Sequence, residues 1–241
     1  ALASNVRRFR ALAGPKRLLL AVVKANAYGH GIVEISRLAL AAGADWLGVH
    51  SAEEGVALRA AEVKAPILVL GPVPSGRFEE AIANGLRFTV YDRNTAEGLS
   101  RTAVRLKTRA RIHIKVETGT NRQGLRLAEL TAFARFLVRL PGIEIEGLSS
   151  HFANVEDTTS LDYAKRQAAL FAEGLAVLRK AGIAVPIRHI AATAAAIVFP
   201  ESSAAQRYGA AGAACPPSSA PTTGPTRRAS STSASGEQSP V

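Results

Sequence analysis

The chain has 241 residues, of which 47% are hydrophobic and 20% charged, and its formal net charge is +11. This length suits one barrel-sized domain or two small ones. The chain has no run of 18 apolar residues and no charged start followed by an apolar block, which excludes a membrane span and a secretory signal. Its single cysteine, Cys215, excludes an internal disulfide and fits a reducing compartment, so we expect a cytoplasmic protein. Methionine is absent even at position 1, which predicts a fragment or a processed product.

The positive charge is spread along the chain rather than gathered into one surface. Basic residues cluster only at 7–10 and 105–111, and aromatic residues make up only 5% of the chain, too few for a base-stacking platform. We therefore expect no nucleic-acid partner. An anionic small ligand or simple solubility explains the charge equally well.

Short apolar runs alternate with longer amphipathic stretches up to Pro200. The apolar runs predict strands at Leu18–Val23, Trp46–Val49, Ile67–Leu70, Phe88–Val90, Ile112–Val116, Ile143–Leu148 and Ile187–Ile190. The amphipathic stretches predict helices near Ile32–Ala41, Ala52–Ala60, Phe78–Ala83, Thr95–Ser100, Leu127–Leu140, Leu161–Ala181 and Thr193–Val198.

These seven strand–helix units predict an α/β fold with a parallel sheet covered on both faces. A closed TIM-type (β/α)8 barrel needs one more strand, and the eighth is not readable. An open doubly wound sheet is the alternative. The sequence disfavours it because no G-x-G-x-x-G turn follows the first strand.

The composition changes after Glu201. Residues 202–241 are dominated by Ala, Ser, Gly, Pro and Thr, with no Leu, Ile or Phe. Such a segment cannot bury enough apolar surface to offset the entropy of ordering it, so we expect a barrel domain over 1–201 and a disordered tail over 202–241. The abrupt change leads to the hypothesis that the tail is an out-of-frame translation product.

A lysine follows the first predicted strand, in the string KANAYGHG at residues 24–31. Barrel enzymes hold their active sites at this end of the strands, and burial there lowers the pKa of an amine and makes it nucleophilic. Taken alone, a lysine at a strand end is more often a solvated charge.

Three further segments extend the pattern: APILVLG at 65–71, KVETGTNRQG at 115–124 and GLSSHFA at 147–153. Together with KANAYGHG they resemble the alanine racemases, enzymes that bind pyridoxal 5′-phosphate (PLP) in a barrel domain. The resemblance runs in order from about Ser4 to Glu201.

The resemblance implies a set of residues around PLP. Lys24 is implied to link covalently to PLP and to act as one of two catalytic bases. Tyr28 and Thr193 are implied to bind the phosphate, and Leu70 to line the pocket. On its own, Tyr28 could equally cap a helix start.

Three other residues follow from the same resemblance. Arg122 is implied to bond the phenolic oxygen of PLP, and Lys115 stands where the family often carries a carbamylated lysine that orients this arginine. His151 is implied to lie by the PLP ring. Without the family, Arg122 could pair with Glu117, and His151 could be a polar loop residue.

The end of the chain departs from the family pattern. Ala192 replaces an asparagine, and only the string QRYGA at 206–210 matches part of the eighth-strand segment. There Arg207 is implied to bond the pyridine nitrogen and Gly209 to offer a phosphate-binding amide, although Ala210–Ala214 predicts a poor strand. The family's C-terminal β domain, which supplies a tyrosine base across a homodimer interface, has no counterpart here.

The resemblance implies interconversion of L- and D-alanine, an isomerase activity that supplies D-alanine for peptidoglycan. A PLP-binding barrel without catalysis, a fragment without function and a related racemase or decarboxylase of the same fold are the alternatives. No metal site is expected, because the histidines lack metal-ligand spacing.

Overall fold

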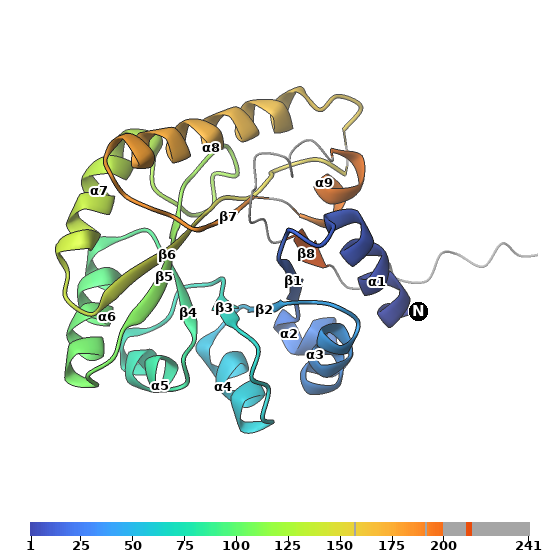
Figure 1. Cartoon of the computed structure of the whole chain (residues 1–241), viewed down its shortest axis with the longest axis horizontal. Helices are drawn as coiled ribbons and strands as arrows, with labels where there is room; N and C mark the ends of the chain where they lie inside the picture. The colour runs from blue at the N-terminus through green and yellow to red at the C-terminus, as the bar shows by residue number, and fades with distance from the viewer. Residues whose placement is uncertain (157, 191, 200–210, 214–241) are drawn as a thin grey trace, which may run out of the picture.

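A computed structural model describes residues 1–156, 158–190, 192–199 and 211–213. Within them, eight strands form one curled sheet in the order β7-β6-β5-β4-β3-β2-β1-β8, with every adjacent pair parallel (Figure 1). The strands are β1 (Leu19–Val22), β2 (Trp46–Val49), β3 (Ile67–Val69), β4 (Arg87–Val90), β5 (Ala110–Lys115), β6 (Ile143–Ser149), β7 (Ile187–His189) and β8 (Ala211–Ala213).

Helices alternate with the strands along the chain and cover the outer face of the curled sheet (Figure 1). They are α1 (Leu2–Ala13), α2 (Lys24–Tyr28), α3 (Ile32–Ala41), α4 (Ala52–Ala60), the 3-10 helix η1 (Ser75–Arg77), α5 (Phe78–Ala83), α6 (Arg93–Arg105), α7 (Leu127–Arg139), α8 (Asp162–Lys180) and α9 (Thr193–Val198). None of these described helices is long and apolar enough to cross a bilayer. The seven predicted strand–helix units and the barrel-type fold are confirmed.

The strands hold two apolar layers because successive side chains point to opposite faces. The outward-facing side chains, such as Leu19, Leu47 and Ile67, are fully buried beneath the helices. The intervening residues Leu20, Trp46 and Leu68 form a second, smaller cluster inside the curl. This inner cluster fills the barrel at one end and leaves the carboxyl ends of the strands for the site.

Helix α1 and the full length of α6 differ from the sequence prediction, which has no helix before Leu18 and only Thr95–Ser100 in the region of α6. In α1, Val6 and Ala13 are buried and Leu2 and Phe9 pack against the core, so the helix has an apolar stripe at the spacing i, i+4, i+7 and i+11 that the sequence already contained. Helix α6 spans Arg93–Arg105 instead of the predicted Thr95–Ser100, because Asp92 caps its start by accepting a hydrogen bond from the Thr95 N–H at 2.8 Å.

A strand forms where the sequence predicts a poor one. Ala211–Ala213 pairs in parallel with β1, with Leu19 opposite Ala211. The ladder uses backbone groups only, so a neighbouring strand edge can order even a run of alanine and glycine. Arg207 and Gly209 lie outside the described residues, as does most of the predicted tail.

Candidate active site

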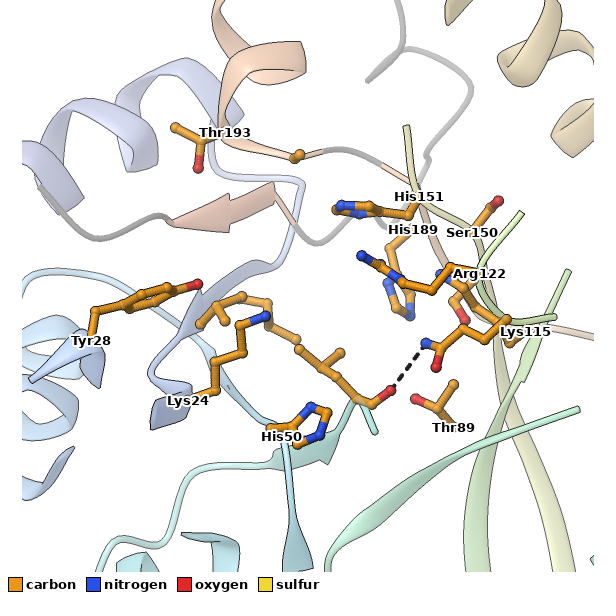
Figure 2. A pocket seen from close by; sticks show the side chains of 16 residues that line it. Lys24, Tyr28, His50, Thr89, Lys115, Arg122, Ser150, His151, His189 and Thr193 are labelled. Atoms are coloured by element: carbon orange, nitrogen blue, oxygen red, sulfur yellow. Dashed lines mark hydrogen bonds between the residues drawn. The ribbon is translucent and has the colours of Figure 1, made fainter. Parts of the chain in front are cut away.

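A cavity of about 380 Å³ opens at the carboxyl ends of the strands. This volume falls in the usual range of small-molecule sites. Figure 2 shows Lys24 and Tyr28 on one side of it, facing Lys115, Arg122 and His151 on the other. The described residues that line it include two lysines, one arginine and three histidines but no Asp or Glu, so the pocket suits an anionic ligand. The lining residues are Leu20, Val22, Lys24, Tyr28, His50, Leu70, Thr89, Lys115, Arg122, Gln123, Ser149, Ser150, His151, His189, Ala192 and Thr193.

The turn that carries Lys24 and Tyr28 is left-handed. Ala25, Asn26 and Ala27 each have φ of 53°, and Tyr28 has 56°. This conformation costs a residue with a side chain roughly 1–2 kcal/mol. Backbone strain of this kind is concentrated at functional sites. The turn sends both Lys24 and Tyr28 to the same cavity.

Local contacts hold part of this strained turn. The Ala27 N–H donates to the Val23 carbonyl at 2.8 Å, and the Ala27 side chain is buried in the main core. Asn26 accepts the Ile32 N–H on its Oδ1 at 2.9 Å, which ties the turn to the first residue of α3. The turn is therefore fixed at its middle and at its exit.

Lys115 ends β5 and is buried, with 7% of its surface exposed. Burial and, to a lesser extent, the positive charge of Arg122 together lower the pKa of its amine to about 7, against the opposing charge of Glu117. A large fraction of Lys115 is consequently neutral near neutral pH, and a neutral amine is a nucleophile.

Arg122 lies on a loop that Glu117 organises. The Glu117 carboxylate accepts the Gly119 and Thr120 N–H groups at 2.5 Å each and the Arg122 N–H at 3.4 Å. Burial alone would raise the pKa of Glu117, but these backbone hydrogen bonds lower it overall. Glu117 therefore contacts the main chain of Arg122, and the guanidinium lies at the pocket.

The low pKa of Lys115 predicts a pH-dependent stability. Its ordinary pKa is 10.5, so between pH 7 and 10.5 the unfolded chain binds a proton that the folded chain does not. The free energy of unfolding therefore rises with pH across this window, by at most about 1.4 kcal/mol per pH unit. The stability gained in this way is lost again as the pH falls from 10.5 to 7. Urea unfolding in CO₂-depleted buffer checks it: Lys115→Met flattens the slope, and an identical slope in both chains would contradict the assignment.

His151 follows β6 and is neutral at physiological pH. Burial, together with the positive charges of Lys115, Arg122 and Lys24, lowers its pKa to about 4, against the opposing charge of Glu156. Its carbonyl accepts hydrogen bonds from Thr120 Oγ1 at 2.7 Å and Gln167 Nε2 at 3.1 Å. His151 thus offers an uncharged ring on a fixed backbone.

A partly buried polar chain runs from the wall of the pocket, at His189, into the barrel. His189 Nε2 is 2.8 Å from His113 Nδ1, and His113 Nε2 is 3.2 Å from Glu146 Oε2. Arg87 Nε donates to the same oxygen at 3.3 Å, and its guanidinium lies 5.1 Å from the centre of the Trp46 ring. Burial lowers the pKa of both histidines and so favours the uncharged form of each ring, while Glu146 opposes this shift at His113.

The structure brings seven of the predicted residues to one cavity. They are Lys24, Tyr28, Leu70, Lys115, Arg122, His151 and Thr193. Their roles remain predictions, and the two others, Arg207 and Gly209, lie outside the described residues. Among the described residues, no group of three His, Cys, Asp or Glu side chains could hold a metal ion.

Sequence reasoning missed other lining residues, notably His50, Gln123 and His189. His50 directly follows β2, and His189 is the last residue of β7. Because barrel sites form at the carboxyl ends of the strands, these two positions could have been predicted as pocket residues from the strand ends alone. Gln123 lies in a loop, and its Nε2 donates to the Leu70 carbonyl at 3.2 Å, which joins the Arg122 loop to the end of β3 (Figure 2).

Fold and site together define an α/β-barrel protein with a cationic small-molecule site at the carboxyl ends of its strands. The sequence profile of the alanine racemase N-terminal domain matches residues 1–213. The chain belongs to this family.

Comparison with individual proteins agrees with the family match. The chain is 42% identical over 202 residues to an alanine racemase of Symbiobacterium thermophilum, covering 84% of this chain and 53% of that protein. It is 40% identical to alanine racemase 1 of Oceanobacillus iheyensis over 83% of this chain and 54% of the relative. The structure of Clostridium difficile alanine racemase in complex with cycloserine superposes with a TM-score of 0.83 at 32% identity, covering 88% of this chain and 57% of the other. The chain thus spans about half the length of the relatives it matches.

Proposed function

We propose that this chain is the PLP-binding barrel of an alanine racemase, an isomerase that interconverts L- and D-alanine. One observation carries the proposal: Lys24, on a strained turn after β1, lies at a cationic pocket without a carboxylate among its described lining residues. The relatives named alanine racemase support it. The proposal includes a cytoplasmic location and D-alanine supply for peptidoglycan, which rest on the family resemblance.

The donor set of the pocket fits PLP, which carries a phosphate, a phenolic oxygen and an aldehyde. The Lys24 amine would hold the aldehyde carbon covalently, and the Tyr28 and Thr193 hydroxyls would hold the phosphate. Arg122 would bond the phenolic oxygen, and His151 would lie by the ring. When bound, PLP supplies an electron sink that stabilises a carbanion next to an amino group.

The residues of this chain then move the proton of the substrate. The Lys24 amine accepts the Cα proton of alanine on one face and returns it. His151 is neutral at working pH, because its pKa is about 4, and so adds no positive charge beside Lys24. Racemisation needs a second base on the opposite face. In the family that base is a tyrosine of the C-terminal domain of the partner in a homodimer, and the same arrangement is part of the proposal.

Lys115 is proposed as the lysine that reacts with CO₂. Its neutral amine would form a bond from Nζ to the carbon of CO₂ and release a proton, leaving a carbamate anion beside Arg122. A negative group there would pair with the guanidinium and fix its direction. The pKa of about 7 and the closeness of the Arg122 charge support this step.

Deuterium exchange tests the proposed function. The chain is incubated with PLP and L- or D-alanine in D₂O, and Cα deuteration is followed by NMR with D-alanine formation followed by chiral chromatography. We expect PLP-dependent deuteration that requires Lys24. PLP binding without deuteration would favour the non-catalytic PLP-binding barrel, and no PLP binding would contradict the proposal.

A further inference from the structure

Glu54 connects the ends of the first two strands. Its Oε1 accepts the Ala25 N–H at 2.6 Å, immediately after Lys24, and its Oε2 accepts the His50 N–H at 2.7 Å, immediately after β2. The two oxygens of one carboxylate therefore bridge backbone groups that belong to different strand–helix units. Glu54 itself lies in the first turn of α4.

We propose that Glu54 is the positioning residue that sets the direction of the Lys24 side chain. The Ala25 N–H belongs to the peptide group that leaves Lys24, so its hydrogen bond to Glu54 fixes the backbone on the far side of the Lys24 Cα. This is also the first peptide of the left-handed turn, whose residues cost energy to hold.

The contact requires two acceptor oxygens on one side chain. Oε2 also receives the Ser51 N–H at 3.4 Å, while the Ser51 Oγ accepts the Glu54 N–H at 3.4 Å, so that Glu54 completes a capping box at the start of α4. A glutamine has one oxygen and one NH₂ group, and the NH₂ group cannot accept an N–H. Glu54→Gln therefore loses either the Ala25 or the His50 contact while keeping the size of the side chain.

A neighbouring residue separates this role from ordinary helix capping. Ser51 takes part in the same capping box but has no hydrogen bond to the turn in the described structure. Ser51→Ala therefore weakens the start of α4 and leaves the carboxylate bridge between Ala25 and His50. Glu53, in the same helical turn, pairs with Arg77 at 2.9 Å and supplies a second control, Glu53→Gln, with the same change of charge.

The test compares these three variants with the unmodified chain. One readout is amide hydrogen exchange at residues 25–31 without any ligand, and the other is the dissociation constant of PLP from absorbance, which rests on the proposed function. For Glu54→Gln we expect at least about tenfold faster exchange at Ala25 and at least about tenfold weaker PLP binding, equivalent to about 1.4 kcal/mol. Ser51→Ala and Glu53→Gln should lower the melting temperature by no more than a few degrees and leave both readouts within about twofold.

Two results would overturn the inference. One is an Ala25 amide that shows no protection from hydrogen exchange in the unmodified chain. This measurement does not depend on whether any variant folds. The other is a Glu54→Gln variant whose exchange and PLP affinity match those of Ser51→Ala. If the unmodified chain binds no PLP, the proposed function fails, and the exchange measurement still decides whether Glu54 holds the turn.

Discussion

Lys24→Ala is expected to abolish the covalent link to PLP and to slow Cα deuteration of alanine by about a thousandfold or more. The variant loses both the amine that would hold the aldehyde and the base that would accept the proton. The remaining donors, including Tyr28 and Arg122, still line the cavity, so weak noncovalent binding of PLP should persist. Absorbance in the visible range reports the link, and NMR in D₂O reports the exchange.

The matched control is Lys16→Ala. Lys16 is exposed and lies before β1, away from the residues that line the cavity. The Lys16→Ala substitution also removes one lysine amine, and it should leave the visible absorbance and the Cα deuteration unchanged. Equal absorbance and exchange in Lys24→Ala and the unmodified chain would refute the role given to Lys24.

Gly124→Ala is expected to cause the largest loss of stability, roughly 2–4 kcal/mol, and to displace the Arg122 loop. Gly124 has φ of +134°, which a side chain rarely allows, and an added Cβ would lie 2.8 Å from the Glu117 nitrogen. The hydrogen bonds between Leu125 N–H and the Lys115 carbonyl and between Glu117 N–H and the Leu125 carbonyl would have to shift, because they form the same short bridge.

Gly182→Ala is the control that separates the cost of a positive φ from the cost of a steric clash of the added Cβ. Gly182 has φ of +74°, and nothing lies within 4 Å of an added Cβ. It should cost only about 1 kcal/mol. Urea unfolding midpoints of both variants measure the difference. If Gly124→Ala were no less stable than Gly182→Ala, the close packing of the loop on β5 would be wrong.

The sequence predicts most of the barrel because its strands are continuous apolar runs. Ile67–Leu70 and Trp46–Val49 could be read as strands without any knowledge of their neighbours, since parallel strands covered by helices are buried on both faces. Lys24, Lys115 and His151 could be placed at one site for a related reason. Each stands at or just after the carboxyl end of a strand, and those ends meet.

Other features depend on distant partners and could not be read locally. The left-handed turn at 25–28 contains no glycine, and a contact that holds it comes from Glu54, 29 residues from Ala25. The partly buried chain of His189, His113 and Glu146 joins three strands, and each residue alone looks like an ordinary polar position. Strand β8 forms on the edge of β1 in spite of its weak strand propensity.

Mapping the lysine that reacts with PLP tests the central claim most directly. The chain is mixed with PLP at a near-stoichiometric ratio, reduced with borohydride, digested and analysed by mass spectrometry. The structure predicts one phosphopyridoxyl group, on the peptide that contains Lys24, in a pocket whose cationic side chains concentrate the anionic cofactor. Label spread over exposed lysines such as Lys16 and Lys64, or no label at all, would contradict a PLP site in this barrel.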